Sequence, residues 1–132
     1  LIDWDDLLLR KDLQFVNLQY GDCEEEIAQV EQGLGIQILR WPDIDLRNDL
    51  EMVLALINEL DCVCSVGTAV SSIAGSSGVP TFLLLQKSWI LLGETEFYPW
   101  YSNVKPFIVG HDEHVGLNIK NLHPFIKKRF DK

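Results

Sequence analysis

Residues 60–85 read LDCVCSVGTAVSSIAGSSGVPTFLLL, and this stretch decides the fold class. The apolar run 62–66 predicts a strand that ends at a glycine. Residues 68–76 are rich in Ala, Ser and Gly and predict a helix that also ends at a glycine. Residues 81–85 are apolar on both faces, as expected of a parallel strand that is buried from both sides. The stretch therefore predicts a strand, a helix and a second strand parallel to the first.

The same alternation extends over the whole chain. Further strands are expected at 15–20, 36–39 and 104–109. Further helices are expected at 1–12 (as a short helix or a lead-in arm), between Asp22 and the glycines at 33 and 35, after Asp49, and over 113–130. Asp22 and Asp49 are expected to cap the helices that follow them. The pattern predicts an α/β fold, a three-layer Rossmann-like sandwich with a mainly parallel sheet. A length of 132 residues fits one domain over 1–132.

The composition and charge exclude several classes of protein. The chain is 47% hydrophobic and 23% charged, which is an ordinary globular profile. Its net charge of −9 argues against nucleic acid and anionic membranes as partners. No apolar run is long enough to span a bilayer, and no signal peptide is recognisable, so a cytoplasmic location is expected. The start at Leu1 suggests a domain taken from a longer protein.

The charges and cysteines are unevenly placed. Residues 1–61 carry 15 acids and 4 bases, whereas residues 62–132 carry 5 acids and 7 bases, so an anionic ligand is repelled less by the second half. Cys62 and Cys64 lie two apart on a predicted strand and point the same way. Such neighbours do not normally form a disulfide, and the three cysteines have no zinc-site spacing. The pattern favours reduced thiols in a cytoplasmic protein.

The turn between the strand at 62–66 and the next helix is the candidate for chemistry. Ligands bind at the carboxyl ends of parallel strands, and the first turn of a helix presents free N–H groups to an anion. Thr68, Ser71 and Ser72 add hydroxyl groups, so the turn is a plausible diphosphate cradle. The alternative is a helix that packs tightly on its sheet through Ala and Gly, with Thr68 as a plain N-cap. Neither a P-loop nor a G-x-G-x-x-G motif is present.

Three blocks of sequence together resemble one family. Residues 60–80 are similar to the pattern L-D-x-V-I-S-V-D-T-A-x-x-H-L-A-G-A-L-G-x-P, residues 17–22 (NLQYGD) to a first-strand L-Q-Y-G-D, and residues 99–102 (PWYS) to a P-W-Y-P/S block. In their order along the chain (17–22, 60–80, 99–102), these blocks resemble the donor half of GT-B glycosyltransferases, in particular the heptosyltransferase-like and tetratricopeptide-associated bacterial families. The resemblance covers about residues 13–107.

The resemblance implies the donor-nucleotide domain of a glycosyltransferase that takes its sugar from a nucleotide diphosphate sugar, with no cofactor. The acceptor site, and commonly the catalytic base, belong in this family to an N-terminal domain that the chain lacks, so the chain alone is expected to be inactive and its catalytic residues are unknown. The residues expected to bind the donor are Gln19, Tyr20, Gly67, Thr68, Ala69, Ser71, Ser72, Trp100 and Tyr101. Gln19 would hydrogen-bond a base or a phosphate, and the two aromatic rings would stack on a base or a sugar. Alternatively, these residues have structural roles. Gln19 would then be a polar residue at the end of a strand, and Trp100 and Tyr101 would anchor the loop on the domain.

Two residues depart from the family pattern. Gly67 stands where the family has Asp, and Ser72 stands where it has His. Either change can alter the choice of donor or weaken the site. The competing hypothesis is therefore a degenerate, non-catalytic module that binds a nucleotide or a partner. Residues 111–114 (HDEH) resemble a metal cluster, but adjacent residues on a turn diverge, and no metal site is expected.

The parallel strands also lead to an expectation about position. Thr68 is expected to face a cleft formed with the loops at 19–22 and 100–101, because all three segments are expected to follow strands that, if parallel, end at one edge of the sheet.

Overall fold

A computed structural model describes residues 2–114 and 117–130 of the chain. The chain divides into two compact units, Leu1–Val53 and Leu54–Lys132, and each is described here by itself. Both units combine helices with parallel strands, so the predicted α/β class is confirmed. The single domain over 1–132 stays a prediction.

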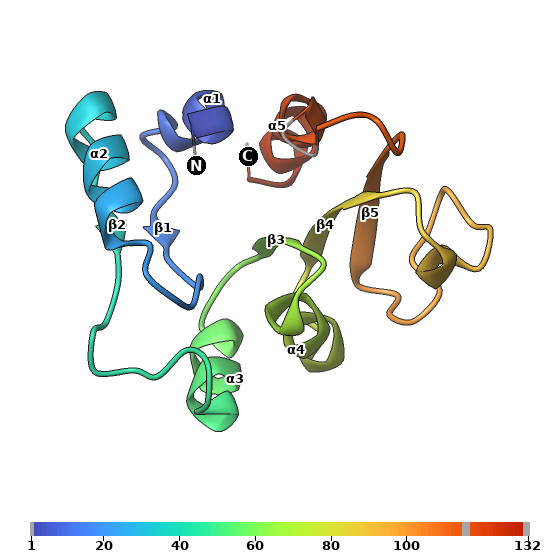
Figure 1. The fold of residues 1–132 in the computed structure, drawn as a ribbon, viewed down its shortest axis with the longest axis horizontal. Coiled ribbons are helices and arrows are strands. Elements are labelled where there is room, and N and C mark those ends of the chain that lie inside the picture. The colour runs from blue at the N-terminus through green and yellow to red at the C-terminus, as the bar shows by residue number, and fades with distance from the viewer. Residues whose placement is uncertain (1, 115–116, 131–132) are drawn as a thin grey trace. The chain divides into compact units, whose positions relative to one another are not determined.

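The first unit is built around a pair of short strands (Figure 1). Its elements are η1 (Ile2–Trp4), α1 (Asp5–Leu8), β1 (Phe15–Val16), α2 (Glu24–Leu34) and β2 (Ile38–Leu39), and the boundary between the units falls inside α3 (Leu50–Asn58). β1 and β2 are parallel, with Phe15 opposite Ile38 and Val16 opposite Leu39. The expected short helix within residues 1–12 is therefore present as η1 and α1, and residues 9–12 are not helical.

Helix α2 supplies two of the four buried residues of one core cluster in this unit. Ile27 and Val30 are three residues apart, so they share a face, and both are buried with Leu8 and Ile38. The expectation for Asp22 is wrong, because Cys23 occupies the N-cap position and no side chain caps the helix. Gly35 ends the helix in the left-handed conformation, with a φ of 66°, which glycine adopts at little cost.

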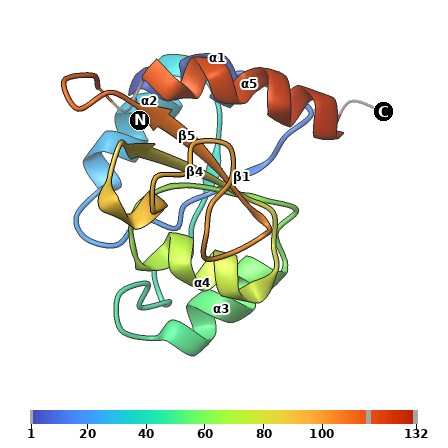
Figure 2. The ribbon, with the colours of Figure 1, turned by 90° about the vertical axis from the view of Figure 1, so that its right-hand side faces the viewer.

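The second unit is a three-layer sandwich. Its elements are β3 (Val63–Val66), α4 (Ala69–Ser77), β4 (Thr81–Gln86), η2 (Trp89–Leu91), β5 (Val104–Val109) and α5 (Leu117–Phe130), after the C-terminal part of α3. The strand order is β3-β4-β5, and both pairings are parallel. Figures 1 and 2 show α4 and α5 on opposite faces of this sheet. Pro106 lies on β5, an edge strand of this sheet, as its missing N–H predicts.

β4 is the buried centre of the second unit. Leu83 and Leu84, which point to opposite faces, are 2% and 1% exposed. On α5, the buried side chains of Ile119, Leu122 and Ile126 follow the helical spacing and give that helix its apolar face. The two-faced apolar pattern of residues 81–85 is therefore explained by a helix on each side of the strand.

Small residues in α4 admit a neighbouring aromatic ring. A Cβ atom added at Gly75 would lie 2.5 Å from Cδ2 of Tyr101, a distance that side chains do not tolerate. Tyr101 stacks on Tyr98, with ring centroids 6.3 Å apart. The nearby Asn103 donates from Nδ2 to the carbonyls of Ala74 and Val79, at 3.2 and 2.7 Å. The loop before β5 is thus held against the C-terminal half of α4.

We expect Gly75→Ala to lower the free energy of unfolding of the second unit by about 1–3 kcal/mol, because the new methyl group must displace the Tyr101 ring. Ser76→Ala, at the exposed neighbouring position, is the matched control and should change stability little. Urea unfolding followed by tryptophan fluorescence measures both. If the two variants unfold at the same urea concentration, the close packing of Gly75 on Tyr101 does not contribute to stability.

Candidate functional site

The turn from β3 into α4 presents the start of a helix at the carboxyl end of a parallel strand. Thr68 is the N-cap residue, with extended backbone angles, and α4 begins at Ala69. The N–H groups of Ala69 and Val70 belong to the first turn, where no preceding helical carbonyl accepts them. α4 carries no acidic or basic residue in its first or last turn. An anion at this point meets the positive end of the helix dipole with no opposing charge from α4 itself.

The hydroxyl groups of this turn are not equally available. Ser71 is 7% exposed, its Oγ accepts from the Thr68 N–H at 3.3 Å, and its own proton goes to the Thr68 carbonyl at 2.7 Å. Ser65 Oγ donates to the Val66 carbonyl at 2.8 Å and lies 3.3 Å from Thr68 Oγ1, so in that contact Thr68 is the donor. Ser71 therefore stabilises the turn, whereas Thr68 can exchange one long hydrogen bond for a ligand.

Three predicted residues border this turn on its solvent side: Gly67, Ala69 and Ser72 are all exposed. A Cβ atom at Gly67 would meet nothing within 4 Å, and its φ does not lie in the left-handed region. The backbone therefore does not require glycine there. The absence of a side chain leaves open space beside the N-terminus of α4.

Trp100 and Tyr101 take different places from those expected. Tyr101 packs on Gly75, seven residues beyond Thr68 and so about 10 Å along the helix. Both aromatic residues immediately precede β5, whereas the expected cleft requires segments that follow strands. The expectation that Tyr101 lies beside Thr68 is therefore wrong. Trp100 donates its indole N–H to the Ile90 carbonyl at 2.8 Å and remains 53% exposed.

The first unit has its own cavity, where β1 and β2 end. The cavity measures about 240 Å³ and is lined by Asn17, Gln19, Tyr20, Gly21, Cys23, Glu24, Arg40, Trp41, Pro42, Ile44, Asp45, Leu46 and Arg47. It includes the predicted Gln19 and Tyr20, beside an indole ring and two arginines that the sequence reasoning missed. The aromatic rings of Tyr20 and Trp41 are each 45% exposed. Gln19 and Thr68 belong to different units, so their expected common cleft stays a prediction.

Asn17 explains why β1 is shorter than predicted. Its N–H continues the pairing, donating to the Leu39 carbonyl at 2.8 Å. Its side-chain Oδ1 then accepts from the Gln19 backbone N–H at 3.1 Å and from Gln19 Nε2 at 3.2 Å. This local turn takes the chain out of the strand at residue 17. The asparagine within the predicted strand was the signal that could have revealed both the turn and the anchoring of Gln19.

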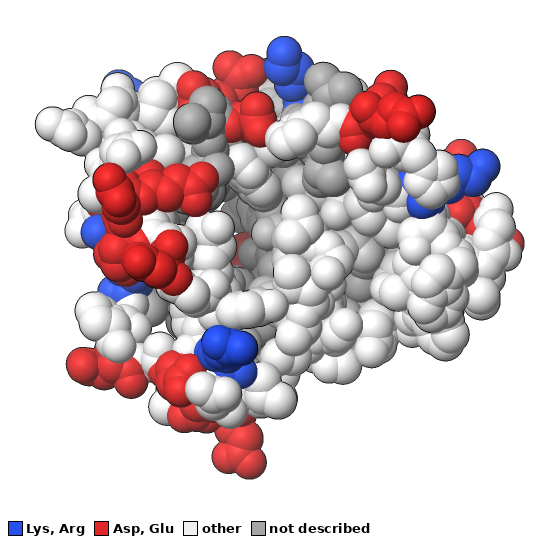
Figure 3. Space-filling view, viewed as in Figure 1, with Lys and Arg blue, Asp and Glu red and all other residues white. Residues whose placement is uncertain are grey.

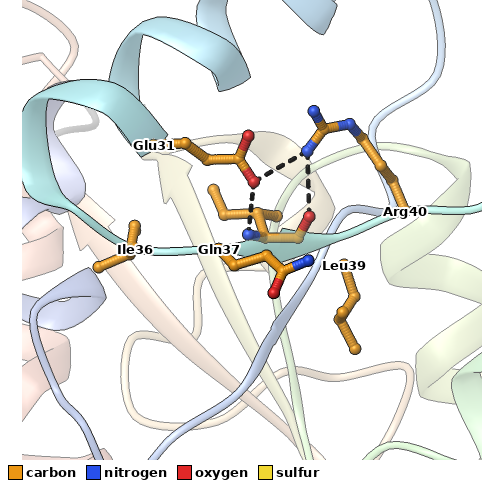
Figure 4. Close-up of a pocket in the computed structure, with 6 residues that line it drawn as sticks. Glu31, Ile36, Gln37, Leu39 and Arg40 are labelled. Atoms are coloured by element: carbon orange, nitrogen blue, oxygen red, sulfur yellow. Dashed lines mark hydrogen bonds and ion pairs between the residues drawn. The ribbon is translucent and has the colours of Figure 1, made fainter.

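Arg40 is held by two carboxylates. Its Nη1 donates to Glu31 Oε1 at 2.9 Å and to the Ile38 carbonyl at 3.1 Å, and its Nε lies 2.9 Å from Glu24 Oε2. Glu31 Oε1 also accepts from the Ile38 N–H at 2.7 Å (Figure 4). These bonds tie α2 to β2. Since Arg40 lines the cavity, they also fix one cation at its wall.

The contacts of Glu31 shift its titration. The hydrogen bond from Arg40, then that from the Ile38 N–H, lowers the pKa of the Glu31 carboxyl below its usual value, against the opposing effect of burial. An adjoining cavity of about 340 Å³ is lined by Glu31, Arg40 and residues 36–39 (Figure 4). The Glu31–Arg40 pair forms part of its wall.

The two candidate regions differ in surface charge. Figure 3 shows acidic side chains gathered over α2, whose first turn carries Glu24, Glu25 and Glu26, while the surface over α4 is uncharged. Within the described residues no group of three or more His, Cys, Asp or Glu side chains is placed to hold a metal ion. Glu113 instead accepts from the Gly110 N–H at 2.7 Å. Among the described helices, none has the length and hydropathy needed to cross a membrane.

The chain is similar to part of one known protein. Protein FlbA of Caulobacter vibrioides is 45% identical over 106 residues, which is 80% of this chain. Those residues are 18% of that protein, so the chain spans about a fifth of the length of the relative it matches. No protein-family model matches the chain. No solved structure matches it.

The Glu31–Arg40 pair gives a pH-dependent prediction. Because the pKa of Glu31 is lowered by folding, its stabilising effect is present above the usual glutamate pKa and is lost as the pH falls through the folded value. We expect Glu31→Gln to cost about 1 kcal/mol at pH 7, a value reduced for solvent screening, and the difference from wild type to shrink below about pH 4. Urea unfolding between pH 7 and pH 3 measures this.

Glu25→Gln, which removes an exposed charge from the same helix, is the matched control and should change the free energy of unfolding at pH 7 less than Glu31→Gln does. A Glu31→Gln effect that stays constant down to pH 3 would contradict the assignment of the lowered pKa to Glu31.

Proposed function

We propose that the chain is the donor-binding part of a glycosyltransferase and that it binds the nucleotide diphosphate of a nucleotide sugar. The observation that carries the proposal is the cavity at the carboxyl ends of β1 and β2, lined by Gln19, Tyr20, Trp41 and two arginines. Ligands of open parallel sheets bind at this edge. The chain spans about a fifth of the length of its curated relative, so the glycosyltransferase activity of a complete protein is also a proposal.

The lining of the cavity suits a nucleobase better than a sugar. The faces of Tyr20 and Trp41 offer stacking surfaces, and the amide of Gln19 offers both a donor and an acceptor for a base edge. At about 240 Å³ the cavity is smaller than the roughly 300–1,000 Å³ of drug-sized sites. It therefore accommodates a base and leaves the phosphates and sugar outside.

The start of α4 in the second unit suits a phosphate group. It offers the Thr68 hydroxyl, the first-turn N–H groups and an uncharged surface. In sugar transfer the departing group is the nucleotide diphosphate, whose developing charge such donors stabilise. The proposal assigns donor binding to these residues and assigns them neither the acceptor site nor the catalytic base. A cytoplasmic location is part of the same proposal.

The alternative is a degenerate, non-catalytic module that binds a nucleotide or a partner; its partner-binding form is the one that a nucleotide titration tests. It is favoured by Gly67 and Ser72, which stand where the family has Asp and His. Calorimetric titration with UDP, ADP, GDP and their sugars separates the two. The donor-binding proposal predicts saturable binding of at least one of these ligands. If none binds at millimolar concentration, the proposal fails and the alternative holds.

For the phosphate contact, we expect Thr68→Val to weaken binding of the nucleotide diphosphate by roughly 1.5–3 kcal/mol, as is typical of a hydrogen bond to a charged group. The substitution keeps the shape of the side chain but removes the hydroxyl of an N-cap residue, so circular dichroism checks that the variant is folded before affinities are compared. Ser76→Ala, at the other end of α4, is the control and should bind as wild type does. Equal affinity of Thr68→Val and wild type would remove Thr68 from the site.

For the base contact, considered within the first unit alone, we expect Trp41→Leu to weaken binding of a nucleotide in the cavity by about 1–3 kcal/mol, the value of one aromatic stacking contact. Trp89→Leu is the matched control, because Trp89 is 81% exposed on the loop after β4 and outside the cavity. Calorimetry with the tightest-binding nucleotide compares the two. If both variants lose the same affinity, or neither does, the base does not bind in the cavity.

A further inference from the structure

Two cysteines flank the first residue of β3. Cys62 and Cys64 lie on either side of Val63, so their side chains point to the same face of the strand. Both are unpaired thiols of intermediate exposure. β3 lies at an edge of the described sheet, with β4 on one side only. A small reagent can therefore reach the pair.

The backbone spacing brings this pair within reach of a disulfide. A rise of about 3.3 Å per residue puts Cα atoms two residues apart at about 6.6 Å, and disulfides span about 4.4–6.8 Å. A contraction of about 1 Å would reach the commonest separation. Cys64 is held in register opposite Phe82, whereas Cys62 precedes the paired residues Val63–Val66. Cys62 can therefore supply the movement without breaking the ladder.

The surroundings make the two thiols unequal. The Cys64 thiol donates a hydrogen bond that lowers the pKa of Cys62, and the charge of Arg129 on α5 acts in the same direction, against burial and Asp61. The pKa of Cys64 is raised, by its interaction with Cys62 and by burial. Since the thiolate is the nucleophile, Cys62 is the group that reacts first and Cys64 the one that follows.

We propose that Cys62 and Cys64 form a redox-active dithiol, which peroxides convert into a disulfide at the start of β3. Neighbours on one face of a regular strand do not normally pair, and Cys62 can do so because it lies outside the paired residues Val63–Val66. The Cys62 thiolate attacks one peroxide oxygen, the O–O bond breaks, and a sulfenic acid and hydroxide form. The Cys64 sulfur then attacks the Cys62 sulfur, the S–O bond breaks, and water leaves with the Cys64 proton. Two thiols are oxidised by two electrons, and the peroxide is reduced to water. The assignment is independent of nucleotide binding.

The test is peptide mapping of the 132-residue chain after treatment with hydrogen peroxide. Trypsin cuts after Arg47 and Lys87, so one peptide, 48–87, carries both cysteines, and Cys23 lies in a different peptide, 12–40. We expect peptide 48–87 to become two hydrogens lighter and to resist alkylation until dithiothreitol is added. Cys23 should remain open to alkylation under the same conditions.

Two serine variants test the order of attack. In Cys64→Ser the reaction should stop at a sulfenic acid on Cys62, one oxygen heavier and trapped by dimedone. In Cys62→Ser the remaining Cys64 should react about tenfold more slowly, because it is the less acidic thiol. Circular dichroism of both variants checks that they are folded. Peroxide treatment that leaves two alkylatable thiols in peptide 48–87, or that joins either of them to Cys23, would overturn the proposal, as would faster oxidation of Cys64 than of Cys62.

Discussion

The burial of β4 on both faces is the constraint on which the second unit depends. A strand with Leu83 and Leu84 on opposite sides needs an apolar layer above it and another below it. α4 and α5 supply these layers (Figure 2). A helix that crosses one face to join neighbouring strands makes those strands parallel, so β3 and β4 end at one edge. The start of α4 at that edge follows directly from the need to cover β4.

The two halves of α4 have different surroundings. Its C-terminal half is structural, because Gly75 admits the Tyr101 ring and the Ala74 carbonyl accepts from Asn103. Its N-terminal half, from Thr68 to Ser72, is open to solvent apart from the buried Val70 and Ser71. Of the two interpretations that the sequence left open, tight packing therefore holds for the C-terminal half, and anion binding stays a proposal for the N-terminal half.

The sequence predicted the long, two-faced or strongly periodic elements and missed what depends on single side chains. β4 and α4 were read correctly, and so was the capping role of Asp49, whose Oδ1 accepts from the Met52 N–H at 3.0 Å. The early end of β1 was missed, because it depends on the side-chain bonds of Asn17. The position of Tyr101 was mispredicted, because Tyr101 lies just before β5 and not at the carboxyl end of a strand. The cavity lining at Trp41 and Arg47 arises from a loop, whose path no periodicity records.

Hydrogen–deuterium exchange with and without a nucleotide diphosphate is the most direct test of ligand binding at the carboxyl ends of these strands. Each unit is tested by its own site: phosphate binding predicts slower exchange of the Ala69 and Val70 amides, whose N–H groups would donate to the phosphates, and base binding predicts slower exchange of the backbone at 19–21 and 41–47 around the cavity. Unchanged exchange in both segments at saturating ligand, or protection confined to the C-terminal half of α4, would contradict the account.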